Sequence, residues 1–179
     1  NAALAFYRTD SHSFGGVISG TGALTNLAGT LTLSGASTYS GPTTVAGGTL
    51  LVSGSIGSSA VTVGSGATLA GAGTIGSIAG MSGGTVSPGN SAGVAGTLTV
   101  NGAAALGGGT YACDVTGTGS TDCDKIAASG AVAAGSALTI NLPASAPGGF
   151  SECNAYSWTI MSGSSASAAN MSIGTKWAS

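Results

Sequence analysis

Charged side chains are the rarest feature of this 179-residue sequence, which has three Lys or Arg residues, five Asp or Glu residues and a net charge of −2. None of these charged residues lies between Asp10 and Asp114. Proteins that bind nucleic acid contact the phosphates through clustered Lys and Arg side chains. The composition therefore predicts no nucleic-acid partner.

Long apolar runs are also absent, although 42% of the residues are hydrophobic. Gly, Ser and Thr interrupt the sequence every few positions, and no stretch reaches the roughly 20 apolar residues that a transmembrane helix needs. We therefore expect no membrane-spanning segment. The first residues lack the basic start and apolar segment of a signal peptide, so a secreted form is expected to be a mature or excised piece.

Glycine is abundant instead, with 34 residues, and it punctuates a repeat. The elements AGTLTLSG, GGTLLVSG, GATLAGAG and GGTVSPGN begin at residues 28, 47, 66 and 83, at intervals of 19, 19 and 17 residues. Alternating aliphatic and polar residues between glycine turns indicate short strands, and so short a period is typical of a strand-based solenoid. We predict an all-β fold, a single-stranded parallel β-helix (β-solenoid) with about 18–20 residues per coil.

The repeat divides the chain into three parts: an N-terminal capping segment (1–26), the β-helix repeats (27–142) and a C-terminal segment that continues or caps the helix (143–179). Aromatic residues gather near both ends, where a solenoid needs caps or a partner. The expected capping or assembly residues are Phe6, Tyr7, Phe14, Phe150, Tyr156, Trp158 and Trp177. Alternation predicts inward-facing side chains at Leu31, Leu33, Val45, Leu50, Val52, Val61, Val63, Leu69, Ile75, Val86, Leu98, Val100 and Ile126.

Residues with catalytic or metal-binding chemistry are few. Asp114, Asp122 and Asp124 form the one carboxylate cluster, but they flank a turn expected to be solvated, and we predict no enzyme activity and no catalytic residues. His12 lies in a polar stretch without a ligand partner at metal-binding spacing, and is expected at the surface. We predict no metal site and no cofactor.

Three cysteines favour an oxidising compartment, although weakly. Cys113 and Cys123 are ten residues apart across a turn, and we expect them to form a disulfide. Other pairings among the three remain open. Cys153 is then left for a bond between chains.

Three stretches resemble the passenger repeat of bacterial autotransporters: Thr38–Gly54, Val61–Gly76 and Gly83–Gly102, the last with the turn SPGNS. Leu4–Leu24 and Asp124-Lys125-Ile126 also look like that family. The resemblance implies a right-handed parallel β-helix outside the cell, in the part of a passenger close to the membrane. The family's barrel and plug helix are not in this sequence, and cysteines are uncommon in such passengers.

The functional expectation is a non-enzymatic extracellular structural protein of a bacterial surface filament, sheath or stalk, which assembles end to end with copies of itself. End strands of a solenoid have unpaired backbone groups, and the low charge provides little repulsion between subunits. The alternative is an adhesin, or a passenger fragment, that binds host or neighbouring cells. A third alternative is a polysaccharide-active β-helix enzyme.

Overall fold

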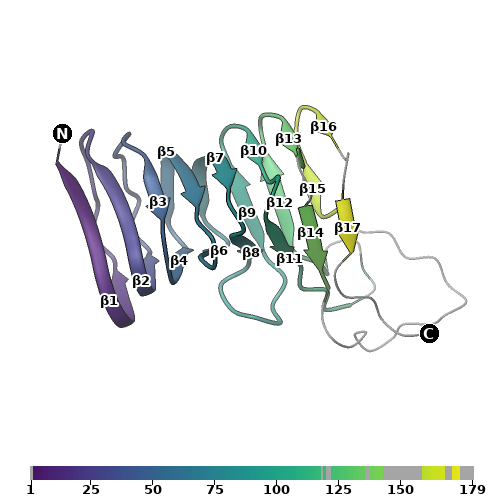
Figure 1. Cartoon of the computed structure of the whole chain (residues 1–179), viewed down its shortest axis with the longest axis horizontal. Coiled ribbons are helices and arrows are strands. Elements are labelled where there is room, and N and C mark those ends of the chain that lie inside the picture. Colours follow the sequence, from purple (N-terminus) through teal and green to yellow (C-terminus); the bar gives the residue numbers. More distant parts are fainter. Residues whose placement is uncertain are drawn as a thin grey trace, which may run out of the picture.

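The protein is a rod of stacked β-coils, seen in a computed structural model that describes residues 2–117, 119, 122–135, 138–142, 159–167 and 171–173 (Figure 1). The described residues form seventeen strands of one continuous sheet. Every pairing between named strands is parallel. The predicted parallel β-helix is confirmed.

The strands are short where glycine corners separate them, and longer where the chain bends without a break. The strands are β1 (Ala3–Phe14), β2 (Ala23–Leu33), β3 (Thr43–Val45), β4 (Thr49–Val52), β5 (Ser55–Val63), β6 (Thr68–Gly71), β7 (Thr74–Met81), β8 (Thr85–Pro88), β9 (Thr97–Val100), β10 (Ala104–Ala105), β11 (Thr110–Ala112), β12 (Lys125–Ala128), β13 (Val132–Ala133), β14 (Leu138–Asn141), β15 (Met161–Ser162), β16 (Ala166–Ser167) and β17 (Met171–Ile173). Figure 1 shows β1 at one end of the rod and β17 at the other.

One position of the coil can be followed through the whole stack, because each strand pairs in register with the next. This column, here called the His12 column, contains His12, Leu31, Leu50, Leu69, Val86, Tyr111, Ile140 and Ile173. Its first intervals are 19, 19, 19 and 17 residues, as predicted, but the next are 25, 29 and 33. The later coils are longer because loops are inserted between their strands, so the predicted 18–20 residues apply only to the first coils.

The core lies inside these coils. Side chains at alternate positions point inward and stack on their neighbours about 4.8 Å away. All thirteen side chains that the sequence predicts to face inward are buried. A second column, the Leu4 column, runs along another wall of the coil through Leu4, Leu24, Thr43, Val61, Ile78, Ala104, Val132 and Ala166.

Next to the His12 column, one position earlier in each coil, a hydroxyl residue is present in every coil: Ser11, Thr30, Thr49, Thr68, Thr85, Thr110, Thr139 and Ser172. Threonine is β-branched and fits the pleated surface of a sheet. Uncharged Thr and Ser residues therefore form the regular outer face of the coils, and a long segment can fold there without charged side chains.

The N-terminal segment is a coil of the helix. Residues 3–14 form β1, which pairs with β2 from Ala3 opposite Ala23 to Phe14 opposite Leu33. The segment expected to lie as a cap across the first coil is thus the first coil itself. Residues 143–158 lie outside the described residues, so the expected C-terminal cap stays a prediction.

Candidate functional site at the N-terminal end of the β-helix

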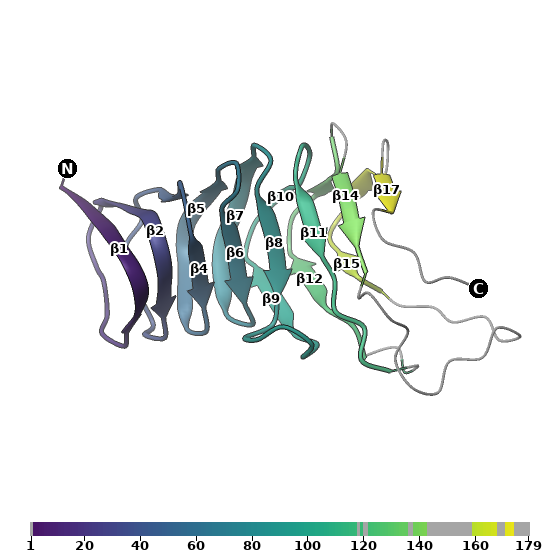
Figure 2. The same ribbon diagram turned by 60° about the horizontal axis from the view of Figure 1, so that its bottom comes forward.

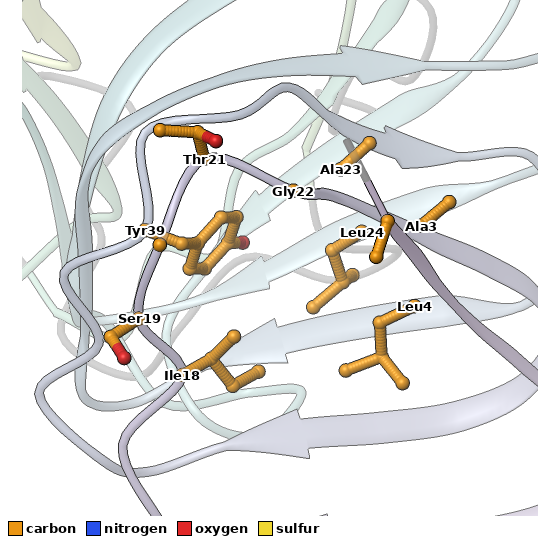
Figure 3. Close-up of a pocket in the computed structure, with 11 residues that line it drawn as sticks. Ala3, Leu4, Ile18, Ser19, Thr21, Gly22, Ala23, Leu24 and Tyr39 are labelled. Atoms are coloured by element: carbon orange, nitrogen blue, oxygen red, sulfur yellow. The ribbon is translucent and has the colours of Figure 1, made fainter.

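A cavity of about 480 Å³ opens at the N-terminal end of the rod. Its walls come from the start of β1, the segment Ile18–Gly22, the start of β2 and Tyr39. In Figure 3 the side chains of Leu4, Ile18, Leu24 and Tyr39 gather around this space. The cavity is the inside of the first coil, seen where no described coil lies on top of it.

β1 has a free edge at this end. One of its edges pairs with β2, and no other strand of the described residues pairs with the opposite edge. Phe6, His12 and Phe14 are half-buried while the remaining residues of β1 are exposed, which shows that these three side chains face the interior. Leu4 is 43% exposed, whereas Leu24 beneath it is 1% exposed. The end coil therefore presents apolar side chains and unpaired backbone groups together.

The wall of the cavity is fixed by a chain of buried hydroxyl groups. The Ser59 hydroxyl donates to the Gly41 carbonyl oxygen at 2.7 Å, and lies 2.7 Å from the Thr43 hydroxyl. The Thr43 hydroxyl is in turn 2.6 Å from that of Tyr39. Because each hydroxyl has one proton, the direction runs from Tyr39 through Thr43 to Ser59. Burial raises the pKa of Tyr39 above its ordinary value, which keeps it a donor.

Among the described residues at this end, the charged side chains are those of Arg8 and Asp10, which form an ion pair. Arg8 and Asp10 form two hydrogen bonds, of 2.8 and 2.7 Å, on the exposed bend of β1. The bond from Arg8 lowers the pKa of Asp10 below its ordinary value. The pair is neutral as a whole, so it adds no net charge to the end of the rod.

The three aspartates predicted to cluster each bind a different part of the backbone. Both carboxylate oxygens of the fully buried Asp124 accept hydrogen bonds, from the Gly96 N–H at 2.8 Å and from the Asp114 N–H at 3.0 Å. Asp114 accepts from the Gly93 N–H at 2.7 Å, and Asp122 from the Gly119 N–H at 2.9 Å.

Two of these carboxylates hold a loop that projects from the rod between β8 and β9 (Figures 1 and 2). Asp124 and Asp114 bind the backbone of residues 93–96, near the end of that loop. Burial raises the pKa of Asp124 to about 6. The sequence suggested that Asp124 flanks a solvated turn, and that prediction is wrong. One of its two partners, Gly96, lies in a loop 28 residues earlier in the chain, a contact without a local sequence signal.

The expected disulfide between Cys113 and Cys123 is absent from the structure, where both residues are buried free thiols. The turn places Cys123 opposite Val115, as an isolated antiparallel bridge, and not opposite Cys113. Such diagonal neighbours are roughly 7–8 Å apart, more than the 4.4–6.8 Å between α-carbons that a disulfide needs. Burial also raises the pKa of Cys113 to about 12, so its thiol stays protonated.

The remaining predicted residues have mixed outcomes. His12 is half-buried at the open end of the rod, where it pairs in register with the buried Leu31, so it is less exposed than the expected surface position. Tyr7 is 78% exposed, and it does not pack into the end coil as Phe6 and Phe14 do. Five predicted residues lie outside the described residues: Phe150, Cys153, Tyr156, Trp158 and Trp177.

In the part of the chain that the structure describes, no group of three or more His, Cys, Asp or Glu residues is placed to hold a metal ion. No helix within the same residues is long and apolar enough to cross a membrane.

Comparison with known families gives a match for one segment of the β-helix. Residues 28–52 match the passenger-associated-transport-repeat family, and they run from the middle of β2 to the end of β4. The resemblance to an autotransporter passenger repeat is thereby confirmed. Among curated proteins no sequence matches the chain. The chain is a parallel β-helix in which residues 28–52 match a repeat of autotransporter passengers, and such a repeat implies a secreted or surface-exposed location.

Proposed function

We propose that this chain is a non-enzymatic structural protein of a bacterial surface, and that it assembles end to end into a filament, sheath or stalk. The observation that carries the proposal is the open end coil. β1 presents a free edge of twelve residues beside a cavity lined by apolar side chains. An exposed strand edge is a template for pairing with another strand.

The other end of the described stack offers a complementary surface. β15, β16 and β17 pair with β12, β13 and β14, and no described strand pairs with their outer edges. All strands run parallel, so the last coil of one copy continues into the first coil of the next without reversal. Contacts between two different ends are heterologous and produce open chains of subunits.

The chemistry of the surface agrees with a structural role. The carboxylates of Asp114, Asp122 and Asp124 each accept a backbone N–H group, which occupies them in holding turns. A net charge of −2 over the whole sequence opposes association only weakly.

Leu4→Lys tests the proposal. Leu4 is exposed at the open end, so a lysine there remains solvated in the monomer, but stacking of another coil would bury its charge. Sedimentation velocity at micromolar concentration should show oligomers for the original chain and monomers for Leu4→Lys. Ala5→Lys is the matched control and should still associate, because Ala5 is the next residue of β1 and pairs with the half-buried Thr25, whereas Leu4 pairs with the buried Leu24.

Negative-stain images of the same samples provide the second measurement. Chains of rods for the original protein and single rods for Leu4→Lys are expected. Single short rods for the original protein at all concentrations would contradict end-to-end assembly, and would favour the adhesin alternative.

A further inference from the structure

His12 occupies a position that is apolar in the coils below it. In the His12 column, the next three coils have leucine at this position, and the following three have Val86, Tyr111 and Ile140. Leu31, directly below His12, is 2% exposed, and Leu50 and Leu69 are fully buried. A titratable ring thus stands where the fold otherwise buries an uncharged side chain.

The surroundings of His12 include few charges. Phe6 lies beside it, with ring centroids 6.4 Å apart. On its own strand the charged residues are Arg8 and Asp10, which are paired with each other. β2, which packs below it, and the segment 15–22, which follows it, contain no charged residue. β2 and the segment 15–22 therefore supply no carboxylate to compensate an imidazolium once the open side is covered. Asp10 on β1, whose pKa is lowered mainly by the hydrogen bond from Arg8 and least by the charge of His12, is already paired with Arg8.

We propose that His12 makes the end-to-end contact depend on pH. A coil of a second copy stacked on β1 covers the His12 ring, and this stacking is favourable only while the ring is neutral. The inference rests on the proposed end-to-end assembly. Continuation of the column places position 173 of a second copy opposite position 12, because Ile140 pairs with Ile173 in the last described coil. Transfer of a charged imidazolium into such surroundings is unfavourable.

The size of the effect follows from proton competition. A histidine side chain changes its charge between pH 5 and pH 8, so a contact that requires the neutral ring should weaken by about an order of magnitude or more over this interval. One such ring is covered in each contact. We therefore expect the association constant to decrease with acidification, and to recover when the pH is raised again.

Sedimentation velocity of the full chain at pH 8 and pH 5 measures this directly, with His12→Leu as the main variant. Leucine is the residue of the next three coils, and His12→Leu should associate equally at both pH values, within about twofold. His12→Gln is a second variant that does not titrate, in case leucine at the open end impairs folding. The control His12→Leu/Ser13→His moves the ring to the adjacent outward position, and should behave as His12→Leu does.

The outcomes separate the two proposals. Association of the original chain that is equal at pH 8 and pH 5, or a pH dependence that persists in His12→Leu and His12→Gln, would overturn the role of His12 and leave end-to-end assembly standing. Absence of association for the original chain and both variants at either pH would overturn the assembly itself, and the role of His12 with it.

Discussion

Asp124 is buried and has a raised pKa, although the sequence around it predicts a solvated turn. It is fully buried, and its two oxygens hold the backbone of Gly96 and Asp114. Those hydrogen bonds favour the charged form, but burial outweighs them and raises the pKa to about 6. The folded protein therefore binds a proton on Asp124 at a pH at which the unfolded chain has released it.

This shift predicts an unusual dependence of stability on pH. A carboxyl pKa raised on folding contributes stability that is complete below its unfolded value, near pH 4, and is lost as the pH rises through about 6. The loss between these pH values is on the order of 3 kcal/mol in the free energy of unfolding. Urea unfolding at pH 4, 5, 6 and 7 should show it, and Asp124→Asn should remove this component. Asp122→Asn, in the neighbouring exposed turn, is the control and should keep it.

At the scale of one coil, the glycines at the corners between strands differ in how closely the backbone of the neighbouring coil approaches them. Gly48, at the corner before β4, has a positive φ of 64°, and a β-carbon there would collide with the backbone carbonyl of Gly29 in the coil below. Gly66, before β6, has a similar φ of 72°, but a β-carbon there meets nothing within 4 Å. The two glycines share a backbone conformation and differ in the space around them.

Gly48→Ala and Gly66→Ala therefore distinguish two costs of a β-carbon at a corner: the strain of the left-handed backbone, and the collision with the backbone of the neighbouring coil. Gly66→Ala should cost about 1 kcal/mol in the free energy of unfolding, the price of a left-handed conformation for alanine. Gly48→Ala should cost more than about 3 kcal/mol, because the coils must also move apart. Thermal and urea unfolding measure both. Equal losses would mean that the coils tolerate separation at this corner.

The same elements show what the sequence predicts and what it does not. Alternation of Leu, Val and Ile between glycines predicts the buried columns, because a strand places every second side chain on one face. It does not reveal Tyr39, Thr43 and Ser59 as one hydrogen-bonded chain, since Thr43 and Ser59 look like surface residues of a Thr/Ser-rich repeat. Nor does it reveal the burial of Asp124, because that depends on a loop from another coil. Local patterns predict which face a residue occupies, whereas partners from other coils need the register.

At the scale of the whole molecule, the described residues form a stack of eight coils with two different ends. Seven spacings of about 4.8 Å place the first and last coils roughly 34 Å apart. The strand β1 and the strands β15–β17 of one chain are therefore too distant to contact each other. They meet only when the last coil of one copy lies on the first coil of another.

That geometry predicts which residues are cross-linked in the assembly. Ser172 and Ser11 end the hydroxyl column at opposite ends of the rod, and a continuous ladder would place them opposite each other in adjacent copies. Ser11→Cys/Ser172→Cys, in a Cys153→Ser background, should form a disulfide between chains on mild oxidation at pH 8, because paired strands hold α-carbons within the 4.4–6.8 Å that the bond requires. Non-reducing electrophoresis should show a ladder of oligomers.

Ser11→Cys/Ser167→Cys is the control and should remain monomeric. The column of Ser167 continues to Ala5, and Ser11 lies in another column. A ladder of equal intensity from both variants would show that the ends meet without a fixed register.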